Sequence, residues 1–130
     1  MTSVMNNLAK ASIVSLLPAA SRNADANSTG VDVSGYEGEA QVIADLGFIS
    51  GTGTLDVKLQ TSSKSDFSSD VDDVTGGAFT QVAGVSSFQT KQLNMNGLKR
   101  YLRVVHDVSA TGSPVYAASV TLVANKKYAA

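Results

Sequence analysis

Four aspartates in the middle of the chain have the residue type and the clustering that could bind a metal ion. They lie in a polar, serine-rich segment from Ser62 to Gly77, at positions Asp66, Asp70, Asp72 and Asp73. Calcium prefers several oxygen ligands on one loop, but the glycine and the final glutamate of an EF-hand loop are absent here. Aspartate and serine side chains also form turns by bonding to the nearby backbone. We expect a structural loop, with a weak calcium site as the alternative.

The only histidine, His106, precedes Asp107 in a chain with many serines, so a Ser-His-Asp hydrolase has to be considered. The Gly-x-Ser-x-Gly motif that presents a nucleophilic serine is absent. His106 shares its alternation phase with Leu102 and Val104, which predicts an inward-pointing histidine at a strand end, bonded to a loop carbonyl. One histidine without any cysteine is also a poor ligand set for zinc.

Three further groups resemble catalytic or binding motifs only in part. Glu37 and Glu39 are two residues apart on one strand, whereas glycosidase carboxylates lie about 5–9 Å apart across a cleft. Gly51-Thr52-Gly53 lacks the Lys-Ser/Thr pair of a phosphate loop and predicts a tight turn. Tyrosines could form a sugar-stacking platform, but core-edge tyrosines with bonded hydroxyls are expected. The four are Tyr36, Tyr101, Tyr116 and Tyr128. We therefore expect neither an enzyme nor a cofactor.

The composition favours one weakly charged domain. The chain has 130 residues, of which 43% are hydrophobic and 16% are charged, a charged share well below the usual value of about 25%. A surface with few charges tolerates being covered by other protein. The net charge is −1, and the only local basic cluster is Lys99, Arg100 and Arg103, so we expect no nucleic-acid partner. No apolar run approaches the length that spans a bilayer, so we expect no membrane partner.

Strand and turn signals dominate from Val31 onward. In Thr54–Ser62, the apolar residues Leu55, Val57 and Leu59 alternate with polar ones, which predicts a half-buried antiparallel strand. Similar segments recur at regular spacing and predict an all-β, antiparallel β-sandwich, jelly-roll or Ig-like, of seven or eight strands. A closed barrel is the alternative. The other predicted strands are Glu39–Leu46, Phe79–Val82, Ser87–Leu93, Leu98–Val108 and Val115–Ala124.

The first thirty residues differ from the rest. They lack aromatic residues, and Ser21–Gly30 has the composition of a linker. The segment before Pro18 fits either an amphipathic helix or a short strand, and we favour an extended arm that ends in a strand at about Ser12–Leu17. The sequence therefore predicts an N-terminal arm and linker over 1–30 and a β-sandwich domain over 31–130.

Four segments, in this order along most of the chain, together resemble a family of small β-sandwich proteins encoded with tailed-bacteriophage head genes. They are Leu17–Ala20, Gly30–Gly38, Leu55–Gln60 and Leu98–Val104. The family is that of capsid decoration, or cement, proteins. The resemblance implies a virion structural protein on the capsid surface, made in the host cytoplasm, whose partner is the phage major capsid protein. It implies no catalytic residues. We expect a homo-oligomer and favour a trimer.

The predicted cementing contact lies in the arm. Its apolar side chains would pack across a subunit boundary, and an arm strand could add to a neighbour's exposed sheet edge. The predicted partner-binding residues are Val4, Leu8, Ile13, Leu16 and Leu17. Two other functions stay open, namely a tail or neck structural component and a carbohydrate-binding β-sandwich module on the virion surface.

Overall fold

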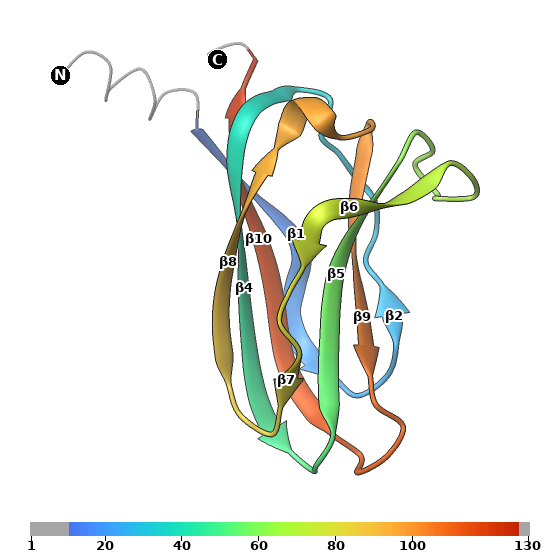
Figure 1. Ribbon diagram of the computed structural model, residues 1–130, viewed down its shortest axis with the longest axis vertical. Coiled ribbons are helices and arrows are strands. Elements are labelled where there is room, and N and C mark those ends of the chain that lie inside the picture. Colours follow the sequence, from blue (N-terminus) through green and yellow to red (C-terminus); the bar gives the residue numbers. More distant parts are fainter. Residues whose placement is uncertain (1–10, 128–130) are drawn as a thin grey trace, which may run out of the picture.

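Alternating apolar residues build two antiparallel sheets that pack face to face, as the sequence predicts (Figure 1). The computed structural model describes residues 11–127. The strands in this part are β1 (Ala11–Arg22), β2 (Ala26–Asn27), β3 (Val31–Asp32), β4 (Tyr36–Ser50), β5 (Thr54–Ser62), β6 (Val71–Ala78), β7 (Val82–Ala83), β8 (Ser87–Asn94), β9 (Tyr101–Val108) and β10 (Val115–Lys126), and a 3-10 turn, η1, spans Met95–Gly97. The predicted antiparallel β-sandwich is confirmed.

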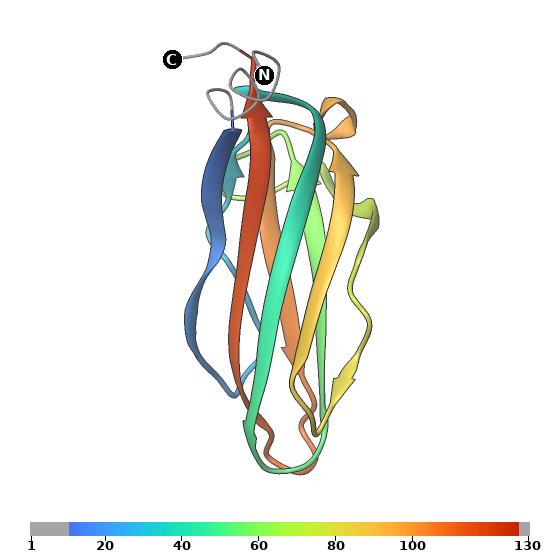
Figure 2. The same cartoon turned by 90° about the vertical axis from the view of Figure 1, so that its left-hand side faces the viewer.

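The two sheets have different strand orders. The first sheet runs β1-β10-β4-β8, and Figure 2 shows it face on. The second sheet runs β2-β9-β5-β6, with β3 paired to β9 and β7 paired to β5. Every strand pair within these sheets is antiparallel. Strands β1 and β8 are therefore the edges of the first sheet.

The core lies between the sheets and consists of inward-facing residues from both. In β5, Leu55, Val57 and Leu59 are buried, as their alternation predicts. In β4, Val42 and Leu46 face them from the first sheet. Full burial of each of these side chains contributes about 1.5–3 kcal/mol to the free energy of folding.

Strand β1 is an integral edge of the first sheet. It pairs with β10 along its length, and Leu16 and Leu17 are each only 2% exposed within the core. The strand predicted at Ser12–Leu17 is confirmed and is longer than expected, whereas the helix alternative is wrong. Pro18 lies in the irregularity between Leu17 and Ala20, where a residue without an N–H group is tolerated on an edge strand.

The predicted boundary at residue 30 does not hold for residues 11–30. The segment predicted as a linker crosses to the second sheet and lies along β9. The Asp25 carboxylate accepts a hydrogen bond of 2.7 Å from the Val108 amide, and the Ser28 hydroxyl accepts one of 2.8 Å from the Val104 amide. Residues 11–30 thus belong to the sandwich, and 1–10 lie outside the described residues.

The aspartate-rich segment contains a strand that its sequence does not predict. β6 occupies Val71–Ala78, and the strand predicted at Phe79–Val82 is reduced to β7. Several side chains of β6 are polar or glycine, so apolar alternation is missing. This strand pairs with β5 at the edge of the second sheet, where Asp73 accepts hydrogen bonds from Lys58 (3.2 Å) and Gln60 (2.9 Å). β4 also extends through Gly47–Ser50, which the sequence assigns to a connection.

Replacing Tyr116 by phenylalanine is expected to destabilise the fold by about 1–3 kcal/mol. The Tyr116 side chain is fully buried, and its hydroxyl accepts a 3.2 Å hydrogen bond from the Gly84 amide. The hydroxyl also lies 3.2 Å from the carbonyl oxygen of Val82. Urea unfolding measures the change. The half-buried Tyr101 provides the control, because Tyr101→Phe is expected to cost less than about 0.5 kcal/mol.

Candidate functional site

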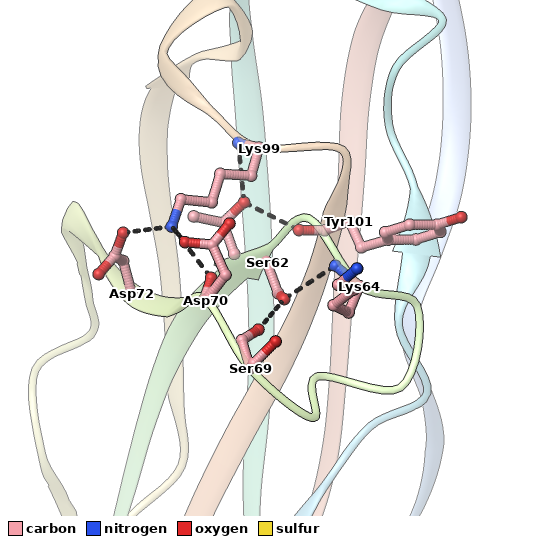
Figure 3. A network of polar contacts seen from close by, with 8 residues as sticks. Ser62, Lys64, Ser69, Asp70, Asp72, Lys99 and Tyr101 are labelled. Atoms are coloured by element: carbon pink, nitrogen blue, oxygen red, sulfur yellow. Dashed lines mark hydrogen bonds and ion pairs between the residues drawn. The ribbon is translucent and has the colours of Figure 1, made fainter.

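Two of the four clustered aspartates, Asp70 and Asp72, pair with the same lysine (Figure 3). Lys99 Nζ lies 2.5 Å from a carboxylate oxygen of Asp70 and 2.6 Å from one of Asp72. Asp73 bonds to β5, and Asp66 accepts a 3.0 Å hydrogen bond from the Ser68 amide in a local turn. Within residues 11–127 there is no group of three or more side chains placed to hold a metal ion. The aspartates therefore do not converge on a calcium ion.

The loop between β5 and β6 is anchored from both sides. The Ser62 hydroxyl donates to the carbonyl oxygen of Ser69 (2.8 Å) and accepts from the Lys64 amide (3.0 Å), as Figure 3 shows. Phe67 is buried, and the Arg103 guanidinium stacks over its ring at 4.4 Å. The Lys99 ammonium holds the pKa of Asp70 below its usual range by hydrogen bonding. These contacts give the loop a structural role.

Lys99→Met is expected to loosen this loop without unfolding the sandwich. The substitution removes both ion pairs to Asp70 and Asp72 but keeps a side chain of similar length. Amide hydrogen exchange in residues 63–70 is expected to speed up a few-fold, while exchange in the core strands stays unchanged. Lys64→Met, an exposed position in the same loop, serves as the control. Equal exchange rates in both variants would contradict the anchoring role of Lys99.

The other predicted chemical groups are not assembled into a site. His106 is 2% exposed and points inward from β9 as predicted, whereas Asp107 next to it is exposed on the opposite face. Burial lowers the pKa of His106, and the nearby Arg22 charge lowers it further. Glu37 and Glu39 are both exposed at the start of β4.

The tyrosines do not share one surface. Tyr116 is in the core, and the half-buried Tyr36 has its hydroxyl 3.5 Å from the Ser12 hydroxyl. Tyr101 lies beneath the Arg100 guanidinium, at 5.4 Å from the ring centre. Tyr128 is outside the described residues. The three tyrosines of residues 11–127 therefore do not form the row of exposed rings that the carbohydrate-binding alternative predicts.

The basic cluster is engaged within the chain. Arg100 pairs with Asp32 at 3.0 Å, and Arg103 donates a 2.8 Å hydrogen bond to the Gln60 side-chain oxygen. Hydrogen bonds from Ser34, and then from Arg100, lower the pKa of Asp32 to about 2. Lys99 and Arg100 are thus paired with aspartates, and Arg103 bonds to the neutral Gln60, so each basic side chain of the cluster is engaged within the chain.

The outer face of the first sheet is broad and poor in charge. We use "the outer face" for the outward residues of its four strands, which are Ala11, Ile13 and Ser15 of β1, Ala117, Ser119, Thr121, Val123 and Asn125 of β10, Glu37, Glu39, Gln41, Ile43, Asp45, Gly47 and Ile49 of β4, and Phe88, Thr90, Gln92 and Asn94 of β8. Glu37, Glu39 and Asp45 are its only charged members. Ile13 is 78% exposed and Phe88 is 67% exposed.

The opposite side of the sandwich has a different character. The outward residues of β5 and β9 include Asp56, Lys58, Arg103 and Asp107. Asp56 accepts a hydrogen bond from Gln81, Lys58 pairs with Asp73, and Arg103 donates to Gln60. Covering a charged face requires its ions to lose water, whereas covering the outer face of the first sheet removes few ions from water. The outer face is therefore the better candidate for a protein contact.

The sequence predicts partner-binding residues that only partly coincide with this face. Ile13 is on it and exposed, as an interface residue must be. Leu16 and Leu17 are wrong as partner contacts, because they fill the core of this chain. Val4 and Leu8 lie outside the described residues. The missed residues belong to β4, β8 and β10, and their polar but uncharged outward positions, such as Thr121, were the available signal.

Sequence comparison identifies no relative, since no protein-family model and no curated protein matches the chain. Similar folds occur among solved structures. A protein of infectious bursal disease virus, Gt strain, has a TM-score of 0.55 at 8% identity, over 92% of this chain and 34% of that one. The CBM22-1 xylan-binding domain from Paenibacillus barcinonensis Xyn10C has a TM-score of 0.50 at 9% identity, over 92% and 88%.

A third similar structure is the SPBc2 prophage-derived protein YomS, with a TM-score of 0.48 at 8% identity, over 88% of this chain and 91% of that one. At such identities the likeness concerns the fold alone. The chain spans about a third of the bursal disease virus protein and most of the xylan-binding domain. The same kind of sandwich thus occurs in viral and in carbohydrate-binding proteins. In the described part of the chain, no helix has the length and apolarity to cross a membrane.

Proposed function

We propose that the chain is a virion structural protein that decorates the outer surface of a phage head. In this role it binds the major capsid protein through the outer face of its first sheet and stabilises the shell across subunit boundaries. The protein is made in the host cytoplasm and acts without catalysis. Many copies on one shell make weak individual contacts effective together.

The observation that carries this proposal is the charge-poor outer face. Its centre is built from small and β-branched side chains, with the exposed Ile13 and Phe88 at opposite edge strands. A surface with few ions loses little hydration energy when another protein covers it. Only three ions, Glu37, Glu39 and Asp45, lose water when another protein covers this face.

The fold is compatible with the same proposal. A viral protein shares the sandwich, and the four-segment resemblance to capsid decoration proteins is consistent with it. A tail or neck component would use the same face to form rings. The decoration role and the tail or neck role are both favoured over a carbohydrate-binding role, because the described tyrosines do not line one surface.

Co-sedimentation with expanded empty capsids tests the proposal. The 130-residue chain is expected to sediment with the shells at saturating copy number, and analytical ultracentrifugation of the free protein reports whether the expected trimer forms. A deletion of residues 1–10 leaves β1 whole and tests the predicted contribution of Val4 and Leu8. Protein that stays in the supernatant while forming rings on its own would support the tail or neck role instead.

A further inference from the structure

A cavity of about 330 Å³ lies where the chain crosses from the first sheet to the second. Figure 1 shows this crossing, from β1 beside β10 to β2 beside β9. Leu17 and Pro18 line one side of the cavity, Asn27 and Ser28 line another, and Arg22 and His106 contribute the groups that can ionise. Of the outer-face residues only Ser15 also lines the cavity, so the inference does not depend on the proposed function.

Two buried polar atoms in this cavity have no hydrogen-bond partner among the described residues. They are Nε of Arg22 and Nδ1 of His106. The Arg22 guanidinium uses another nitrogen to donate to the carbonyl oxygen of Pro18, and no carboxylate of residues 11–127 forms an ion pair with it. A buried donor without a partner costs about 1–3 kcal/mol, and more when it belongs to a charged group. The His106 ring already bonds to the backbone of Ala24, so its Nδ1 becomes a donor when the ring is protonated. A bound molecule that accepts from Arg22 Nε–H and from this Nδ1–H would remove the cost.

We propose that the cavity binds a carboxylate group, which accepts hydrogen bonds from Arg22 Nε–H and from Nδ1–H of His106. Guanidinium and carboxylate form strong, charge-assisted hydrogen bonds, and a carboxylate offers two oxygen atoms for two donors. A water molecule could satisfy the hydrogen bonds but would leave the guanidinium charge uncompensated. The carboxylate belongs either to a small free acid or to an aspartate or glutamate side chain of a partner protein.

Binding of this kind is coupled to protonation of His106. Without ligand, burial and the Arg22 charge lower the pKa of His106, while Asp25 and Asp107 oppose this effect. A carboxylate beside the ring favours the imidazolium form and therefore raises the pKa of His106. Proton uptake then accompanies binding, so the affinity increases as the pH falls through the pKa of the bound form.

Nuclear magnetic resonance of the imidazole ring tests the inference, because His106 is the only histidine of the chain. The pKa of His106 is measured in acetate and in chloride at equal ionic strength. Acetate is expected to raise it by about one unit or more, the usual effect of an opposite charge nearby. A second arm replaces acetate with a blocked peptide that contains one glutamate. A response to acetate alone identifies a small acid, and a response to the peptide identifies a partner side chain.

Variants separate this site from general salt effects. Arg22→Gln is expected to abolish the response, whereas Arg100→Gln, at an exposed arginine paired with Asp32, is expected to preserve it. If Arg22→Gln perturbs folding, Arg22→Lys keeps the charge but removes Nε–H and is expected to weaken binding at least several-fold. The absence of any response in both arms would show that only water occupies the cavity and would overturn the inference. An unchanged response in the Arg22 variants would overturn it too.

Discussion

Thr90→Glu is expected to weaken binding to capsids by about 10-fold to 100-fold, while the sandwich remains folded. Thr90 is exposed on β8 and lies opposite Ile43 in the outer face. A carboxylate placed there must lose water on docking, and an unpaired ion in an interface costs several kcal/mol before relaxation. Each factor of ten in affinity corresponds to about 1.4 kcal/mol. We choose glutamate because a lysine at this position could pair with the nearby Asp45.

The matched control for this variant is Thr75→Glu. Thr75 is also an exposed threonine on an edge strand, β6, but it belongs to the second sheet. Capsid binding by Thr75→Glu is expected to match that of the unmodified protein. The affinities come from titrating each variant onto expanded capsids and measuring the bound fraction after sedimentation. Equal loss in both variants, or loss with Thr75→Glu alone, would show that the outer face is not the docking surface.

Leu17→Ala is expected to destabilise the sandwich by about 2–5 kcal/mol, the usual cost of truncating a buried leucine to alanine. The Leu17 side chain is 2% exposed, and its Cα partner is the fully buried Val120 of β10. Such a loss is a large fraction of the total stability of a domain. Urea unfolding, followed by circular dichroism, measures it.

The control lies on the same strand. Ile13 is 78% exposed on the outer face, and Ile13→Ala is expected to change stability by less than about 0.5 kcal/mol. A small effect of Leu17→Ala would indicate that β1 contributes little to the stability of the sandwich, as expected of an arm that packs on another protein. A large effect means that β1 is part of the folded domain, so an arm contact has to be tested by a deletion that leaves β1 whole, such as the deletion of residues 1–10.

The strands that the sequence predicts well are those with one buried and one wet face. Thr54–Ser62 is the clearest case, and its predicted bounds match β5. β1 was ambiguous because its register with β10 shifts between Ser15 and Leu17, which places the consecutive Leu16 and Leu17 both in the core. A simple two-residue period cannot express such a shift. β6 was missed because backbone pairing with β5, and not apolar alternation, makes it a strand.

The candidate surfaces depend on strand order, which local patterns do not contain. The outer face joins β1, β10, β4 and β8, whose order in space differs from their order in the chain. The low charge of the outer face follows from the composition, but its location can be known only from the order of the strands in the sheet. The cavity likewise brings Arg22 next to His106, which are far apart in sequence and belong to different sheets. The sequence predicts that His106 points inward, but it does not predict that Arg22 lies beside it.

The most direct test of the central claim is cryo-electron microscopy of expanded capsids incubated with the purified protein. We predict additional density on the outside of the shell, in which the sheet β1-β10-β4-β8 faces the capsid and Phe88 lies at the contact. Density with the charged side of β5 and β9 against the shell would contradict the proposed docking face. Shells without added density at saturating protein would contradict the decoration role itself.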